Sequence, residues 1–296
     1  MKKLLLTVLL LLPLPVHALT VVATLPSLAA IAKQVGGAQV QVEALTSPHQ
    51  DPHYADAKPS LIVSLNRADV LVVNGLDLEV GWLPPLLIQS RNARIQKGAA
   101  GYVDASQAVR LLGVPKGPID RAMGDVHPGG NPHFLLDPRS GARVALLVAK
   151  SFAKADPSNA ATYQQNASAL AASLDALAAT TTAQFAQIPA ERRRIVVYHD
   201  SLTYLVDWLG VKQVATLEPR PGIAPSPQHV AEVLQVIKSQ NVKVIAQEEF
   251  YPKNTGKTLA GLAHGALAVL PGGADFPTET YAVHIKNVAQ ALRAGL

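Results

Sequence analysis

The sequence contains no cysteine among its 296 residues. This absence excludes disulfides, thiolate metal ligands, a cysteine nucleophile and a lipid-modified cysteine after an export signal. A chain of this length can bury a hydrophobic core large enough to fold without disulfides. A metal site in this protein would therefore have to do without thiolates.

Charged residues are also scarce, at 16% of the chain, while 49% of the residues are hydrophobic. This composition is typical of a globular protein and argues against disorder. The 26 basic residues exceed the 21 acidic ones only modestly, and their one cluster is Arg192-Arg193-Arg194. Three arginines are too few for a nucleic-acid surface, so we expect no nucleic-acid partner.

Three familiar motifs of nucleotide-binding proteins and zinc enzymes are missing. Gly256-Lys257-Thr258 resembles the end of a phosphate-binding loop, but the residue five positions before Gly256 is Tyr251. The Walker pattern is thus incomplete, and no Gly-x-Gly-x-x-Gly follows a predicted strand. No His-Glu-x-x-His motif is present either, so the sequence offers no signature of a zinc hydrolase.

Residues 1–18 are expected to be a signal peptide. Lys2 and Lys3 form a basic end, and Leu4 to Leu14 form an apolar segment. Val16-His17-Ala18 then places small residues at the positions that a signal peptidase reads. The apolar segment is too short to span a membrane, and no other run is long enough. We therefore expect a soluble, exported periplasmic monomer that starts near Leu19, with no stable membrane insertion after signal removal.

Short apolar segments alternate with amphipathic ones through the rest of the chain. The expected strands are Leu19–Thr24, Val40–Leu45, Ala68–Asn74, Arg194–Tyr198, Val211–Leu217, Val242–Gln247 and Ala266–Leu270. Most of these strands are largely apolar and do not alternate apolar with polar residues, which indicates parallel sheets covered on both faces.

The segment from Asn159 to Gln187 is rich in alanine, leucine and glutamine and contains neither glycine nor proline. As a helix it would be roughly 40 Å long, about the size of a domain. We therefore expect an α/β protein of two lobes, each a mainly parallel sheet flanked by helices. The lobes would span residues 19–158 and 188–296, and one long rigid backbone helix, residues 159–187, would join them.

At four places the sequence puts a side chain that can bind a metal at or just past the end of a predicted strand. They are His53 in Asp51-Pro52-His53, His133 in the proline- and glycine-rich loop 125–138, His199 and Glu248. Ligands bind at the carboxyl ends of strands in open α/β sheets, so a cleft between the lobes could close around one ion. Imidazoles with a carboxylate suit Zn²⁺, and Mn²⁺ or another transition ion is an alternative. Considered one at a time, His199 could instead cap the following helix, and Glu248 could be part of an acidic patch on the surface.

Three histidine motifs resemble those of the cluster A-I (zinc/manganese) substrate-binding proteins of ABC importers. They are Asp51-Pro52-His53, Asn131-Pro132-His133-Phe134-Leu135-Leu136-Asp137-Pro138 and Tyr198-His199-Asp200-Ser201. The matches run from about Leu19 to the C-terminus in the family's order and spacing. The resemblance implies two lobes with a backbone helix and a metal held between them by three histidines and a carboxylate. By this resemblance, the histidine ligands in this chain are His53, His133 and His199.

The fourth ligand departs from the family pattern. Many members place an aspartate where this chain has Val269-Leu270-Pro271-Gly272-Gly273. Glu248 matches a glutamate that the family carries after the preceding strand, so we take it as the fourth ligand, with Asp275 as the alternative. The long histidine- and acid-rich loop of many zinc importers is also missing. His127 is therefore expected to be a bystander, and the role of His49 stays open.

The resemblance implies capture of a divalent ion as transported ligand, Zn²⁺ first and Mn²⁺ second, and its delivery to an inner-membrane ABC permease. No catalysis is expected. The alternatives are an exported zinc-dependent hydrolase, which would need an open coordination position, and a metal chaperone or adhesin on the same fold. Asp51, Asp137 and Asp200 are candidates for orienting ligands or shaping loops.

Overall fold

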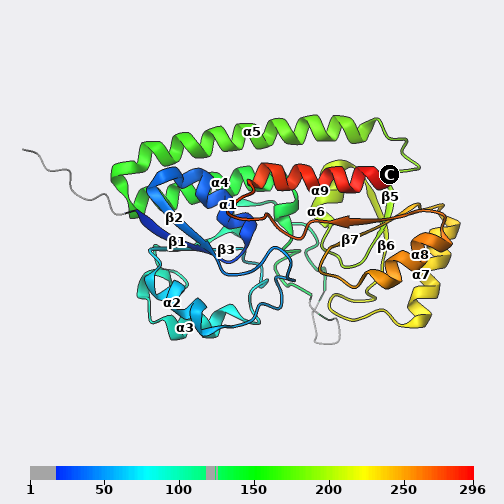
Figure 1. Cartoon of the computed structure of the whole chain (residues 1–296), viewed down its shortest axis with the longest axis horizontal. Coiled ribbons are helices and arrows are strands. Elements are labelled where there is room, and N and C mark those ends of the chain that lie inside the picture. The colour runs from blue at the N-terminus through cyan, green and yellow to red at the C-terminus, as the bar shows by residue number, and fades with distance from the viewer. Residues whose placement is uncertain (1–17, 118–123, 125) are drawn as a thin grey trace, which may run out of the picture.

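The computed structural model describes residues 18–117, 124 and 126–296. All of the expected signal peptide except Ala18 lies outside this part of the chain. Two four-stranded sheets lie side by side, and one long helix extends over both of them (Figure 1).

The first sheet consists of β1 (Leu19–Ala23), β2 (Val40–Ala44), β3 (Val70–Val73) and β4 (Tyr102–Asp104), in the order β2-β1-β3-β4 with every pair parallel. Helices α1 (Pro26–Gly36) and α4 (Pro138–Ala155) pack on one face with Val21 and Val70. Helices α2 (Pro59–Arg67) and α3 (Leu83–Ser90) pack on the other with Val22 and Leu71. Neighbouring residues of a strand thus face opposite helical layers.

The second sheet repeats this arrangement. It contains β5 (Arg194–Val197), β6 (Lys212–Thr216), β7 (Val244–Glu248) and β8 (Ala266–Leu270), all parallel, in the order β6-β5-β7-β8. Helices α6 (Thr203–Leu209) and α9 (Tyr281–Gly295) share one core with Ile195, while α7 (Pro227–Ser239) and α8 (Lys253–Leu262) share another with Val196. The expected parallel sheets with two covered faces are confirmed.

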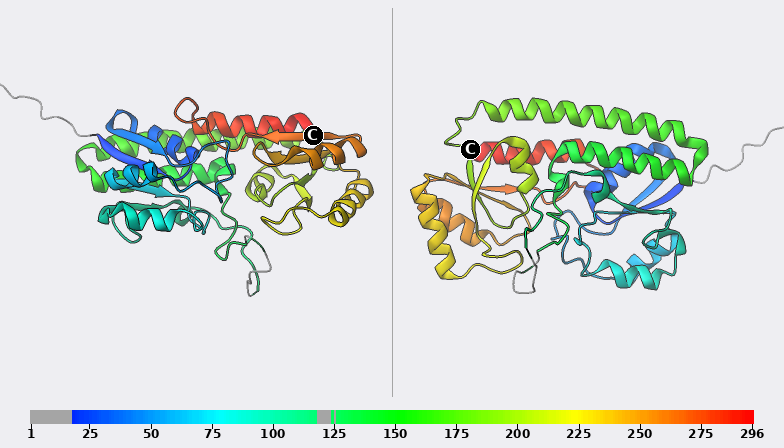
Figure 2. Two further views of the ribbon diagram at one scale, coloured as in Figure 1. Left: turned by 60° about the horizontal axis from the view of Figure 1, so that its bottom comes forward. Right: turned by 180° about the vertical axis from the view of Figure 1, so that it is seen from behind.

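Helix α5 (Ala160–Ala186) has 27 residues and joins the two lobes. It contacts α1 and α4 of the first lobe and α6 of the second, and it also packs on α9. Seen from behind, α4 lies alongside its N-terminal half (Figure 2). At 1.5 Å per residue its length is roughly 40 Å, so the expected long connecting helix is confirmed.

The sequence misleads in two places. The sequence pattern from Leu78 to Ser90 predicts a helix bent at Pro84-Pro85. Helix α3 instead begins at Leu83, which puts both prolines in its first turn. Proline is tolerated there because the first backbone N–H groups of a helix have no partner within it. The edge strand β4 is not expected, because three residues are too few to show a pattern.

Short 3₁₀ helices complete the described elements: Gly37–Gln39, Ala93–Ile95, Ala105–Ala108, Phe134–Leu136 and Pro157–Asn159. Within the described residues, no helix combines the length and the apolar character that a membrane span requires.

Candidate metal centre

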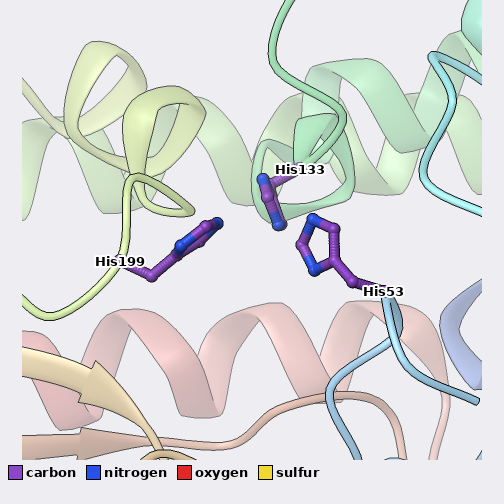
Figure 3. A group of neighbouring side chains, drawn as sticks. All are labelled: His53, His133 and His199. Carbon is purple, nitrogen blue, oxygen red and sulfur yellow. The ribbon is translucent and has the colours of Figure 1, made fainter. Parts of the chain in front are cut away.

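Three histidines from distant parts of the chain meet between the lobes (Figure 3). His53 lies in the loop 45–58 after β2, His133 immediately precedes the 3₁₀ turn Phe134–Leu136, and His199 follows β5. One ligand atom from each ring lies within 4.8 Å of the other two. The ring centroids are 5.2 Å apart for His53 and His133, 5.4 Å for His53 and His199, and 5.3 Å for His133 and His199.

The first two histidines are held by the same local device. Asp51 Oδ1 lies 3.0 Å from the backbone N of His53 and 2.7 Å from its Nδ1. Asn131 Oδ1 lies 3.0 Å from the backbone N of His133 and 3.0 Å from its Nδ1. In each Asx-Pro-His sequence the first residue thus accepts both bonds from the histidine two positions later, in the manner of an Asx turn. The proline between them fixes φ and narrows the choice of backbone shapes.

The third histidine is held by a residue that sequence analysis missed. His199 Nδ1 lies 2.7 Å from Glu218 Oε2, and both side chains are buried. Glu218 follows β6, the strand that pairs with β5. Its position directly after a predicted strand is a signal that could have found it, since the carboxyl ends of parallel neighbours share one edge.

Each imidazole therefore has an oxygen acceptor at Nδ1. A carboxylate or amide oxygen can only accept, so in the neutral ring Nδ1 carries the proton and Nε2 keeps its lone pair. The amide of Asn131 is oriented by its Nδ2, which donates to the backbone oxygen of Asp200. Nε2 is thus the nitrogen that each ring can offer to a metal, and an oxygen partner at Nδ1 also makes the ring more basic.

Burial and neighbouring charges act differently on the three rings. Burial lowers the pKa of His133 well below 6.5, and the nearby His53 and His199 lower it further. Burial alone would also lower the pKa of His199, but the hydrogen bond and the charge of Glu218 raise it above 6.5. His133 is therefore ready as a neutral ligand, whereas a metal at His199 must compete with a proton.

The candidate carboxylates are not among the side chains that lie at ligand spacing, which are His53, His133 and His199. Glu248 ends β7 and is buried, and together with His133 it lines one cavity between the lobes. Burial raises its pKa, and the charge of His199 opposes this shift. Asp275 is 61% exposed at its side chain, with Oδ1 3.6 Å from Nε2 of His49. Among the described residues, the histidines are the groups that the structure brings to ligand spacing.

His127 lies closer to the site than sequence analysis suggests. Its Nε2 is 3.3 Å from Nε2 of His53, and the two ring centroids are 5.3 Å apart. With His133 and His199 it also lines a cavity of about 80 Å³. Burial lowers the pKa of His127 to about 4, so the ring is neutral near pH 7. No sequence pattern indicates this contact.

The remaining candidates shape the loops around the site. Asp137 caps α4 by accepting from the backbone N of Arg139 at 2.8 Å. Asp200 accepts from the Thr203 hydroxyl at 3.1 Å. His49 contacts the second lobe instead, with Nδ1 2.8 Å from Glu249 Oε1. Of the three aspartates, Asp51 orients a histidine, Asp137 caps a helix, and Asp200 binds the side chains of Thr203 and Gln213.

Similarity to known proteins extends over almost the whole described chain. The chain is 26% identical over 280 residues to the iron-binding protein YfeA of Yersinia pestis, covering 93% of this chain and 85% of that protein. It is 24% identical over 245 residues to the manganese ABC transporter substrate-binding lipoprotein PsaA of Streptococcus pneumoniae, covering 82% and 76%.

A solved structure, the crystal structure of ZnuA, superposes with a TM-score of 0.78 at 24% identity and covers 94% of this chain and 99% of that one. It supports the two-lobed fold. Residues 21–295 match the family model described as zinc-uptake complex component A, periplasmic. The chain therefore belongs to this family of periplasmic zinc-uptake components.

Proposed function

We propose that this protein captures a divalent transition-metal ion outside the cytoplasm and delivers it to an ABC permease of the inner membrane. His53, His133 and His199 hold the ion, and Glu248 supplies the fourth ligand. The observation that carries the proposal is the convergence of three imidazoles whose Nδ1 atoms all have oxygen partners. This arrangement leaves three Nε2 lone pairs for one cation.

Zn²⁺ is the ion that the donor set fits best. Imidazole nitrogens with one carboxylate suit zinc in tetrahedral geometry, whereas manganese prefers more oxygen ligands. The relatives named above bear the names of iron and manganese proteins, and the family model that of zinc uptake. Mn²⁺ is therefore the second candidate.

Carriage fits this site better than catalysis. Four protein ligands would fill a tetrahedral zinc and leave no position for a substrate water. A zinc hydrolase needs such an open position. Membership in an uptake family argues in the same direction, against the exported hydrolase.

A competition titration with Zn²⁺ and Mn²⁺ on the purified mature chain tests capture. We expect His133→Ala to weaken zinc binding by more than roughly 100-fold, since losing even a residue that orients a ligand costs roughly 10- to 100-fold. His264→Asn is the matched control, because His264 is exposed and has a left-handed backbone that asparagine tolerates. Unchanged affinity in His133→Ala would contradict the proposal.

Delivery needs a separate measurement. The metal-loaded chain should stimulate ATP hydrolysis by its permease and ATPase in proteoliposomes, and the metal should enter the vesicle lumen. Tight zinc binding without stimulation by any metal ABC transporter of the same cell would favour the chaperone or adhesin alternative.

A further inference from the structure

A small cavity lies between the lobes beside the candidate metal centre. Its volume is about 60 Å³, and residues of both lobes and of α9 line it, among them Asn74, His133, Glu248 and His284. Figure 3 shows α9 crossing the view below the three histidines. One water molecule needs roughly 10–15 Å³ of such space, so the cavity can hold several.

Three side chains that line this cavity each have an atom with no partner among the described residues. The atoms are Asn74 Oδ1, Glu248 Oε2 and His284 Nδ1. The exposed fractions of these residues are only 1%, 4% and 2%. The carboxylate nearest to His284, Glu279 Oε2, is 3.9 Å from its Nδ1 and thus beyond hydrogen-bond distance.

The amide of Asn74 shows which kind of partner is needed. Its Nδ2 donates to the backbone oxygen of Pro132 at 2.9 Å, so Oδ1 is an acceptor. An ionised Glu248 likewise offers only acceptor oxygens. A buried acceptor without a donor is costly, and the great majority of buried polar groups are paired. Three unpaired polar atoms on residues that line one small cavity call for an occupant that both donates and accepts.

Water meets this need better than the alternatives. Each molecule donates two bonds and accepts two, so it can serve acceptor oxygens and either nitrogen state of a neutral imidazole. An apolar occupant would leave all three atoms unpaired. A metal ion would prefer the three histidines, which the structure has already brought to ligand spacing.

We infer that this cavity is a hydration site in which at least two ordered water molecules bridge Asn74 of the first lobe, Glu248 of the second lobe and His284 of α9. The waters tie the lobes together beside His133 and hold the Glu248 side chain in place. The inference concerns the protein without cargo and does not depend on Glu248 being a metal ligand.

A high-resolution crystal structure of the metal-free mature chain tests the site directly. Water density should lie within roughly 2.7–3.2 Å of Asn74 Oδ1, Glu248 Oε2 and His284 Nδ1. Absence of density would overturn the inference. So would an ion with bonds of roughly 2.0–2.1 Å, the distance typical of zinc and nitrogen.

Thermal unfolding of two variants at neutral pH gives an independent test. In a hydrated site, His284→Phe removes a partner of the water and should lower Tm by roughly 2–4 °C. His284→Gln keeps a hydrogen-bonding group and should lower Tm less. In a dry site, His284→Phe would replace an unpaired polar atom by carbon and raise Tm. A Tm of His284→Phe at or above the wild type, or equal losses in both variants, would overturn the inference.

Discussion

His199 and Glu218 form a buried pair, with Nδ1 of the imidazole 2.7 Å from Oε2 of the carboxylate. The two residues follow neighbouring parallel strands, β5 and β6. Glu218 Oε2 also accepts from the backbone N of Gly222 at 3.0 Å, which fixes the carboxylate from a second side. The ring orientation of one candidate ligand is thus set by a residue that belongs to no histidine motif.

Replacing Glu218 should move the pH dependence of zinc binding. Glu218→Gln keeps an acceptor oxygen but removes the charge that raises the pKa of His199. Protons compete with the metal below that pKa, so the pH at which zinc affinity falls should shift downward in the variant. Affinity near pH 8 should drop by roughly 10- to 100-fold. Competition titrations from about pH 5 to 8 measure both effects.

Glu232→Gln is the control for this prediction, because Glu232 lies on α7 and is exposed. An unchanged or upward-shifted midpoint in Glu218→Gln would show that the carboxylate does not govern His199.

The identity of the fourth ligand can be decided by comparing two isosteric variants. Glu248→Gln should weaken zinc binding more than Asp275→Asn, since Glu248 is buried beside His133 whereas Asp275 is exposed and faces His49. Calorimetric titration of each variant against the wild type gives the two losses. A larger loss from Asp275→Asn would assign the role to Asp275.

The hydroxyl of Tyr281 should stabilise the segment that carries His133. It donates to the backbone oxygens of Leu135 at 2.9 Å and Asp137 at 3.3 Å from a fully buried position. Tyr281→Phe leaves these carbonyls without that donor, so we expect a loss of about 1–3 kcal/mol in the free energy of unfolding. Urea denaturation measures it. Stability equal to the wild type would mean that the carbonyls find other donors.

Acid should destabilise the fold through His284. Burial lowers its pKa from 6.5 to about 4, so the unfolded chain binds a proton that the folded chain rejects as pH falls between these values. The contribution of His284 to the free energy of unfolding is therefore complete above about pH 6.5 and is lost as the pH falls toward 4. The loss is about 3 kcal/mol, at about 1.4 kcal/mol per pH unit. Urea unfolding at about pH 7.5 and 4.5 should show this loss in the wild type and a smaller one in His284→Gln. Equal losses would exclude His284 as the cause.

The sequence predicts what depends on local patterns. Apolar strands and the long helix are visible because their periodicity extends over many residues. The Asx-Pro-His sequences at His53 and His133 are visible because all their partners lie within three residues. Glu218 and His127 are missed because their contacts with His199 and His53 join residues far apart in the chain, which only the packed sheets and loops bring together.

Two helices, α5 and α9, each contact both lobes. Folding therefore fixes the relative position of the two lobes that form the site. The conformational entropy of ordering the ligand loops is thus largely lost before an ion binds. A preorganised site of this kind binds tightly because little further ordering is required. Ion binding should accordingly change the heat capacity and the radius of gyration very little. Slow spontaneous release follows from the same stiffness, and a partner that distorts the frame would be needed to unload the ion quickly.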